Sequence, residues 1–297
     1  MKKLTLIIAT FNRSEWVIET LQSVIEQSAE AAAWECIVVN NNSSDDTVER
    51  VEEFISEHNS FDIKIVTETK QGLSHARNRG IEESIGEYIA IIDDDEIINT
   101  QFIEAYIEFF DSHPSVASAG GKIIARYRSS RPKWMSKYTE RPIANPIDLG
   151  DVVCEFPRGV IPGGGNMAIQ RWVLDKYGAF DPSLGRCAEK LIGGEESDLF
   201  ERLRVAGEEC WFVPEAVMYH LIPDEKLNHD YLNRLSYNIG VSQRLRAKIE
   251  KRGYRCAEII KWLGTIAIAL GYTLKGQTSK ANYLIQMRYH ISRGIFS

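Results

Sequence analysis

Short apolar segments alternate with amphipathic helical patterns through the first 125 residues, and this alternation limits the folds open to the chain. Continuous apolar runs at residues 4–9, 36–39, 63–66 and 88–92 are too short for helices and have the composition of fully buried strands. Helical patterns separate these runs, with apolar side chains recurring on one face. The arrangement predicts an α/β fold with a mainly parallel central sheet flanked by helices on both faces.

A polar loop follows each of these expected strands, and ligands of such sheets bind beyond the carboxyl ends of the strands. The loop after the fourth strand begins with three adjacent carboxylates, Asp93, Asp94 and Asp95. Their mutual repulsion would be relieved by a divalent cation, and hard oxygen ligands suit Mg²⁺ or Mn²⁺. Taken alone, the segment could also be a solvated acidic turn.

Two common phosphate-binding motifs are missing from the sequence. No G-x-G-x-x-G follows the first strand, which disfavours a dinucleotide cofactor, and no G-x-x-x-x-G-K-[ST] occurs, which disfavours a P-loop. A metal ion is therefore the expected means of neutralising a bound diphosphate.

Eight short segments follow one another along the chain: residues 7–13 (IIATFNR), 38–47 (VVNNNSSDDT), 72–80 (GLSHARNRG), 86–95 (GEYIAIIDDD), 164–167 (GGNM), 178–181 (GAFD), 194–199 (GEESDL) and 214–220 (PEAVMYH). This ordered set, which covers roughly residues 4–222, resembles the inverting family 2 glycosyltransferases of the GT-A fold. Each segment alone is weakly specific, whereas the ordered set is highly specific.

The resemblance implies a metal-dependent enzyme that uses a nucleotide-sugar donor, with a glycan or a lipid-linked saccharide as acceptor in cell-surface polysaccharide synthesis. The residues that it implies for donor binding are Thr10, Asn12, Arg13, Asn40, Asn42, Arg77, Asp93, Asp94, Gly164 and Asn166. Asp95 would hold the metal, with His220 as a second ligand. Glu196 occupies the place of the general base, beside Glu195.

Two positions depart from the family pattern. Asn40 stands where the family usually has Asp, and Glu196 ends an acidic pair that usually ends in Asp. The Asn40 amide carries no charge, unlike the usual carboxylate. The longer Glu196 side chain moves its carboxylate by about one methylene, which would change its distance from the acceptor hydroxyl and so affect general-base catalysis. A catalytically degenerate carbohydrate- or nucleotide-binding homologue therefore stays as an alternative. A sugar nucleotidyltransferase is a second alternative, although the loop at residues 10–13 lacks the glycines that its phosphate loop would need. The acidic pair could also simply favour the dipole of a helix first turn.

The expected organisation is a glycosyltransferase domain at residues 1–228 and a basic helical extension at residues 229–297. Within the domain, residues 126–162 combine basic and aromatic side chains with five prolines and predict a mobile loop over the site. A merely variable surface insertion is the alternative for this stretch.

Charge and cysteine content indicate the compartment and the partners. Residues 244–297 carry 11 Lys and Arg against two acids, whereas the whole chain has a net charge of −7. This basic tail, with an apolar stretch at residues 262–274, predicts peripheral contact with the inner face of a membrane. Packing on the domain or on a dimer partner is the alternative.

The five cysteines are scattered and form no C-x-x-C pair, which favours the reducing cytosol. We expect no nucleic-acid partner.

Overall fold

The structure is a computed structural model that describes residues 2–185, 193–250 and 254–297. The chain divides into two compact units, and each is described by itself. The first, called the sheet unit, comprises Met1–Ile124, Ile147–Gly185 and Glu195–Leu221. The described parts of the second, the helical unit, include Ala125–Pro146 and extend from Ile222 to the C-terminus. The division therefore differs from the expected boundary at residue 228, because a segment from the middle of the chain groups with the C-terminal helices.

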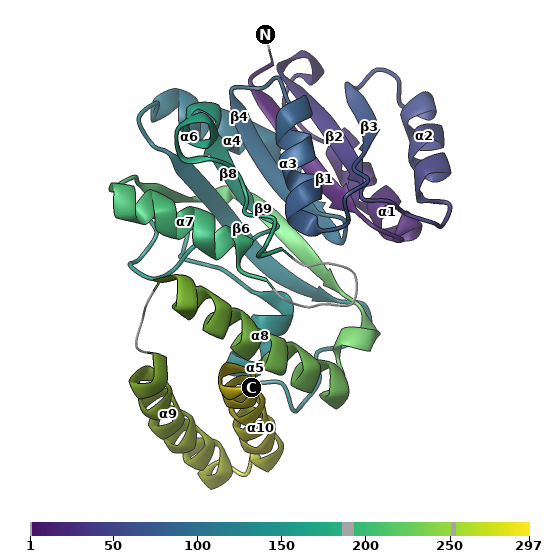
Figure 1. Ribbon diagram of the computed structural model, residues 1–297. Coiled ribbons are helices and arrows are strands. Elements are labelled where there is room, and N and C mark those ends of the chain that lie inside the picture. The colour runs from purple at the N-terminus through teal and green to yellow at the C-terminus, as the bar shows by residue number, and fades with distance from the viewer. Residues whose placement is uncertain (1, 186–192, 251–253) are drawn as a thin grey trace. The chain divides into compact units, whose positions relative to one another are not determined.

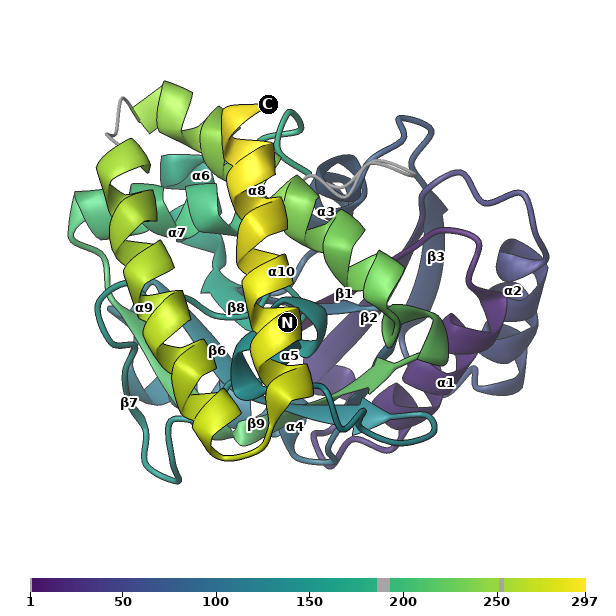
Figure 2. The same cartoon turned by 90° about the horizontal axis from the view of Figure 1, so that it is seen from below.

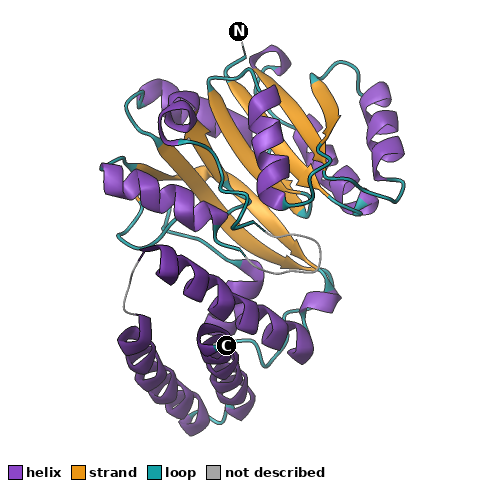
Figure 3. Ribbon diagram, in the orientation of Figure 1, coloured by secondary structure: helices purple, strands orange, loops and turns teal. Residues whose placement is uncertain are grey.

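The described strands form one nine-stranded sheet, shown in orange in Figure 3. The strands are β1 (Leu4–Thr10), β2 (Trp34–Asn40), β3 (Ile63–Thr67), β4 (Tyr88–Asp93), β5 (Glu96–Ile98), β6 (Ser118–Tyr127), β7 (Cys154–Glu155), β8 (Met167–Gln170) and β9 (Cys210–Ile222). Their order is β3-β2-β1-β4-β8-β6-β9-β5, with β7 paired to β9. The sheet is parallel from β3 to β4, as expected from the sequence, whereas β8 joins β4 in antiparallel orientation.

Helices cover both faces of the sheet (Figure 1). Those of the sheet unit are α1 (Ser14–Ile25), α2 (Thr47–Glu57), α3 (Leu73–Glu83), α4 (Phe102–Ser112), α6 (Arg171–Tyr177) and α7 (Glu195–Ala206), with a 3₁₀ turn η1 (Ala31–Ala33). Alternate side chains of β1 enter different cores: Leu6 packs with α1, α2 and α4, and Ile7 packs with α3, α6 and α7. This two-sided burial explains why the strands are continuously apolar.

Strand β9 runs through Pro214 without a break and is 13 residues long. The three cysteines whose state is described, Cys36, Cys154 and Cys210, are free thiols. Cys187 and Cys256 lie outside the residues whose side chains are described.

The helical unit contains α5 (Lys137–Ala144), η2 (Asp224–Lys226), α8 (His229–Glu250), α9 (Tyr254–Leu274) and α10 (Thr278–Phe296). Its apolar core joins α5, α8 and α10 through residues such as Met135, Leu235 and Leu284. The expected loop at 126–162 therefore contains a helix, capped by Ser136, whose side chain accepts a hydrogen bond from the Thr139 amide. Movement of this stretch over the site stays a prediction.

Candidate functional site

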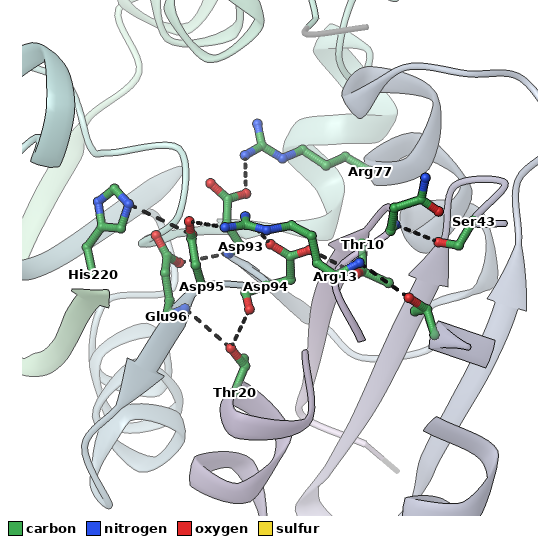
Figure 4. Close-up of polar contacts among 12 residues, drawn as sticks. Thr10, Arg13, Thr20, Ser43, Arg77, Asp93, Asp94, Asp95, Glu96 and His220 are labelled. Carbon is green, nitrogen blue, oxygen red and sulfur yellow. Dashed lines mark hydrogen bonds and ion pairs between the residues drawn. The ribbon is translucent and has the colours of Figure 1, made fainter. Parts of the chain in front are cut away.

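The acidic loop after β4 is held by groups from the loop after β1 (Figure 4). Asp94 and Asp95 are buried, and the Arg13 guanidinium bridges them at 2.7 Å from Asp94 Oδ1 and 3.0 Å from Asp95 Oδ2. The Thr10 hydroxyl donates to Asp94 Oδ2 at 2.8 Å. Burial raises the pKa of the Asp94 carboxyl; Arg13 opposes this shift and Asp95 adds to it. Thr10 and Arg13 thus position this loop through their side chains.

Asp95 and His220 approach each other from different strand ends. Asp95 Oδ1 lies 3.8 Å from His220 Nε2, and Figure 4 shows the imidazole directed toward the carboxylate. Among the described residues, no group of three or more His, Cys, Asp or Glu side chains is arranged to hold a metal. Mg²⁺ characteristically takes one or two protein carboxylates and completes its shell with substrate phosphates and water. The pair therefore fits a divalent cation that is bound together with a diphosphate.

Arg77 is the centre of a second cluster of charged groups. Its side chain, from α3, is fully buried. The guanidinium donates to Asp93 Oδ1 at 2.9 Å, to the Gly164 carbonyl at 3.0 Å, and to Oε1 of both acids at the start of α7. Burial alone would lower the pKa of Arg77, but Asp93 and the two glutamates raise it, so the guanidinium stays charged. The structure thus places Arg77 as an internal support, where direct contact with the donor was expected.

Glu195 and Glu196 begin α7, as the sequence predicted. They lie 3.2 Å and 3.0 Å from the same Arg77 nitrogen, but the Glu195 side chain is 2% exposed and the Glu196 side chain 22%. Glu196 is therefore the more accessible of the two carboxylates, whereas Glu195 is buried.

The two glycines before Asn166 leave room for acidic side chains. A Cβ atom at Gly164 would lie 1.9 Å from Glu196 Oε1, and one at Gly165 would lie 1.8 Å from Glu96 Oε1. The backbone therefore approaches both carboxylates more closely than any other residue type would allow. A glycine at position 164 is therefore required for this placement of Glu196, because any side chain there would collide with its carboxylate.

Asparagine side chains fix the loops after β1 and β2, and that of Asn12 joins one loop to the other. Asn12 Oδ1 accepts from the Ser44 amide at 2.7 Å, and Asn40 Oδ1 accepts from the Ser43 amide at 2.9 Å. Asn12 and Asn42 adopt positive φ values of 51° and 66°, which asparagine tolerates better than most residues. Asn40 is buried, whereas Asn12 and Asn42 are exposed. Donor contacts by these three side chains stay predictions.

Asn166 was expected to bind the donor, which stays a prediction; the structure shows its contacts within the protein. Its side chain is fully buried. The amide group donates to the carbonyls of Lys122 and Ala216 at 3.1 and 3.0 Å, and its oxygen accepts from the Tyr106 hydroxyl. Asn166 therefore connects β6, β9 and α4 inside the sheet unit. The spacing of apolar residues in the sequence could not indicate these hydrogen bonds, because the partners of Asn166 are distant in sequence.

Glu96 is a site residue that the sequence interpretation passed over. It is buried, its Oε2 accepts from the Asp93 amide at 2.7 Å, and burial raises the pKa of its carboxyl well above the usual range. Glu96 follows the three aspartates directly, so the signal was the continuation of the acidic run into an apolar strand. Glu96 fixes the loop that carries Asp93 and Asp95.

Solved structures share this fold. A mannosyltransferase from Pyrobaculum calidifontis, solved with GDP-Man and Mn²⁺, aligns with a TM-score of 0.62 over 97% of this chain and 86% of its own, at 19% identity. The chain therefore has the mixed α/β architecture of the GT-A fold, with a helical C-terminal region. At this identity, the likeness concerns the fold alone.

Sequence relatives are biosynthetic enzymes. The chain is 24% identical over 253 residues to a glucosyl-dolichyl phosphate glucuronosyltransferase of Haloferax volcanii, covering 82% of this chain and 77% of the relative. It is 25% identical over 236 residues to the succinoglycan biosynthesis protein ExoM of Rhizobium meliloti, covering 78% and 71%. The sequence model of glycosyl transferase family 2 matches residues 5–178, more than half of the chain. The protein therefore belongs to glycosyl transferase family 2 and is a glycosyltransferase.

Proposed function

We propose that this glycosyltransferase moves a sugar from a nucleoside-diphosphate-sugar to a hydroxyl of a glycan or lipid-linked acceptor, with inversion at the anomeric carbon. The observation that carries the proposal is the cluster around Arg77, which gathers Asp93, Glu195, Glu196 and Gly164 from separate segments. The names of the two relatives, a glucosyl-dolichyl phosphate glucuronosyltransferase and a succinoglycan biosynthesis protein, support the acceptor class and a role in cell-surface polysaccharide synthesis.

The donor side of the proposal depends on Asp95 and His220. A divalent cation between these groups and the donor diphosphate would supply Lewis-acid stabilisation of the leaving group. Mn²⁺ or Mg²⁺ suits their oxygen and imidazole atoms, and the Mn²⁺ bound with GDP-Man in the Pyrobaculum enzyme supports this choice. Arg13 offsets part of the negative charge of Asp94 and Asp95 and holds both in place.

The acceptor side depends on Glu196. Its greater exposure makes it the candidate base, because a base must reach the acceptor hydroxyl. Arg77 holds Oε1 of this carboxylate, so Oε2 is the atom that would take the proton as the hydroxyl attacks the anomeric carbon. Glu195, bonded to the same arginine nitrogen, keeps the guanidinium in position.

The proposed place of action is the cytoplasmic face of a membrane, with residues 244–297 as the peripheral contact. The structure describes one helix in this tail that is long and apolar enough to cross a membrane, spanning Ala257–Leu274. A lipid-linked acceptor would be presented at that surface.

A screen of nucleotide sugars tests the proposed reaction. The purified chain is incubated with single UDP-, GDP- and dTDP-sugars, with Mn²⁺ or with EDTA, and release of nucleoside diphosphate is followed. We expect nucleoside diphosphate to be released from one donor in the presence of Mn²⁺, and no release from it in the presence of EDTA. Donor binding without turnover, even with candidate lipid-linked acceptors, would instead support the degenerate homologue. Pyrophosphate-dependent nucleotide exchange would support the nucleotidyltransferase.

A further inference from the structure

Helix α9 exposes most of its large aliphatic side chains and bonds several of its polar side chains to a neighbouring helix. Its outward side carries large apolar residues that are 44–89% exposed: Ile259, Ile260, Leu263, Ile266, Leu270 and Leu274. Five of these, all except Ile260, follow one another at spacings of three or four residues and therefore form a single stripe. We call the six residues the outer stripe. In the helical unit, α9 packs beside α10, as Figures 1 and 2 both show.

The inward side of α9 carries polar groups that bond to α10. Glu258 is buried, and its Oε1 accepts from the Ser292 hydroxyl at 2.8 Å and from Arg288 at 3.4 Å, both on α10. The Trp262 indole also donates to Ser292, at 2.8 Å, and Thr265 accepts from Arg288 at 3.3 Å. Ile268 and Tyr272 pack on the core of the helical unit, whereas the outer stripe has no such cover from the described residues of that unit. Such an arrangement is stable when the surroundings of the outer stripe are themselves apolar.

The charge of the surrounding segment identifies the apolar partner. Residues 257–297 contain five Lys and Arg and one acid, and that acid is Glu258, which is bonded to Arg288. Lys261 and Lys275 lie near the two ends of the outer stripe and are exposed. A second copy of this chain would bring the same positive charge against itself, which opposes association. Anionic phospholipid offers both a negative surface and a hydrocarbon interior.

We propose that α9 lies in the plane of an anionic membrane, with the outer stripe inserted at the boundary between headgroups and acyl chains. The 21 residues of α9 would suffice to cross a bilayer. However, the bonded Glu258 and Arg288 on its inner side would then enter the hydrocarbon, together with the polar residues of α10. A helix with one apolar side and one polar side is better satisfied in the interface. The two lysines would reach headgroup phosphates.

The proposal deepens the membrane part of the proposed function and does not rest on sugar transfer. Flotation of the full chain is measured without donor, using phosphatidylcholine vesicles with or without about one third phosphatidylglycerol. We expect co-flotation with the anionic vesicles only. Replacing Leu263 and Leu270 together by Asp should lower the partition coefficient at least tenfold, about the effect of losing a buried apolar side chain.

A matched control replaces two exposed apolar residues of the sheet unit, Ile85→Asp with Val152→Asp, and should bind vesicles as the wild type does. Replacing Lys261 and Lys275 by Gln should weaken binding at low salt, by roughly fivefold per lysine. The Leu263→Asp/Leu270→Asp variant should keep wild-type nucleoside diphosphate release, which separates failure of docking from failure of catalysis.

Three results would overturn the proposal. The first is a wild-type chain that does not float with anionic vesicles at low salt. The second is a wild-type dimer in sedimentation experiments without lipid that becomes monomeric on Leu263→Asp/Leu270→Asp, which would assign the outer stripe to a second copy. The third is membrane-bound protein that resists alkaline carbonate extraction, which would indicate that α9 crosses the bilayer.

Discussion

Gly164→Ala is the substitution for which the site geometry makes the sharpest prediction. The new methyl carbon would lie 1.9 Å from Glu196 Oε1, 2.8 Å from its carboxyl carbon and 3.2 Å from an Arg77 nitrogen. Arg77 is fully buried and fixed by several acceptors, so the Glu196 side chain is the part that must move. Its displacement breaks the 3.0 Å bond to Arg77 and moves the proposed base.

The expected effect is larger on catalysis than on stability. A hydrogen bond between charged groups contributes about 1.5–3 kcal/mol, and the partial exposure of Glu196 reduces this to about 1–2 kcal/mol of unfolding free energy. A displacement of about 1 Å can lower a reaction rate roughly 100-fold. We therefore expect kcat to fall by about two orders of magnitude, while donor affinity changes little, because Asp95 and His220, the proposed ligands of the metal that holds the donor diphosphate, are not displaced.

Steady-state nucleoside diphosphate release and urea unfolding measure the two quantities. Gly264→Ala is the matched control, because no atom lies within 4 Å of the position that its new methyl carbon would take, and it should leave turnover unchanged. Adding Gly164→Ala to Glu196→Gln should lower kcat little further, since both act on the same carboxylate. Wild-type kcat in a folded Gly164→Ala enzyme would refute the reasoning, and so would full additivity of the two substitutions.

Three further predictions concern separate parts of the site. Glu196→Gln should keep donor binding and lower kcat roughly 100-fold or more, because the amide cannot accept the proton; near-normal turnover in kinetic assays would remove Glu196 as the base. Asn166→Ala should lower the unfolding free energy by about 3 kcal/mol in urea titrations, because it leaves buried carbonyls and a buried hydroxyl without partners; a change below about 1 kcal/mol would contradict this role. Protease cleavage within residues 126–162 should slow when nucleoside diphosphate and Mn²⁺ are added, as for a segment that closes over the site; equal rates would count against closure.

The parts of the fold that follow from local patterns were predictable from the sequence. The parallel strands from β3 to β4 are short apolar runs, and the loops that follow β1, β2 and β4 contain the polar residues expected at such an edge. Glu195 and Glu196 begin a helix, in agreement with the acid-rich first turn. These features depend on neighbours in sequence, so composition and spacing are sufficient to indicate them.

The interior role of Arg77 could not be predicted in the same way. Its carboxylate partners on α7 are 118 and 119 residues away, and no local pattern distinguishes a buried arginine from an exposed one. The buried contacts of Asn166 could not be predicted for the same reason, since its partners are the backbones of strands separated from it by 44 and 50 residues. The exposure of the outer stripe of α9 also required the structure, because a stripe of apolar residues in the sequence is equally typical of a helix face that packs in a core.

The helix α5 could not be predicted from the sequence, because it is short and contains a proline. Pro142 lies inside the helix and suggests a break, and eight residues are too few to establish a helical period. A local signal was nevertheless present in Ser136, which occupies the N-cap and forms a reciprocal capping box with Thr139.

Calorimetric titration of the donor, with and without Mn²⁺, tests the central claim that Asp95 and its neighbours form a metal-dependent donor site. The wild-type chain should bind the donor identified in the screen with Mn²⁺ and lose that binding with EDTA. Asp95→Asn should remain folded and lose the Mn²⁺-dependent affinity, while Glu196→Gln should keep it. Unchanged donor affinity in a folded Asp95→Asn chain, with Mn²⁺ present, would contradict the account.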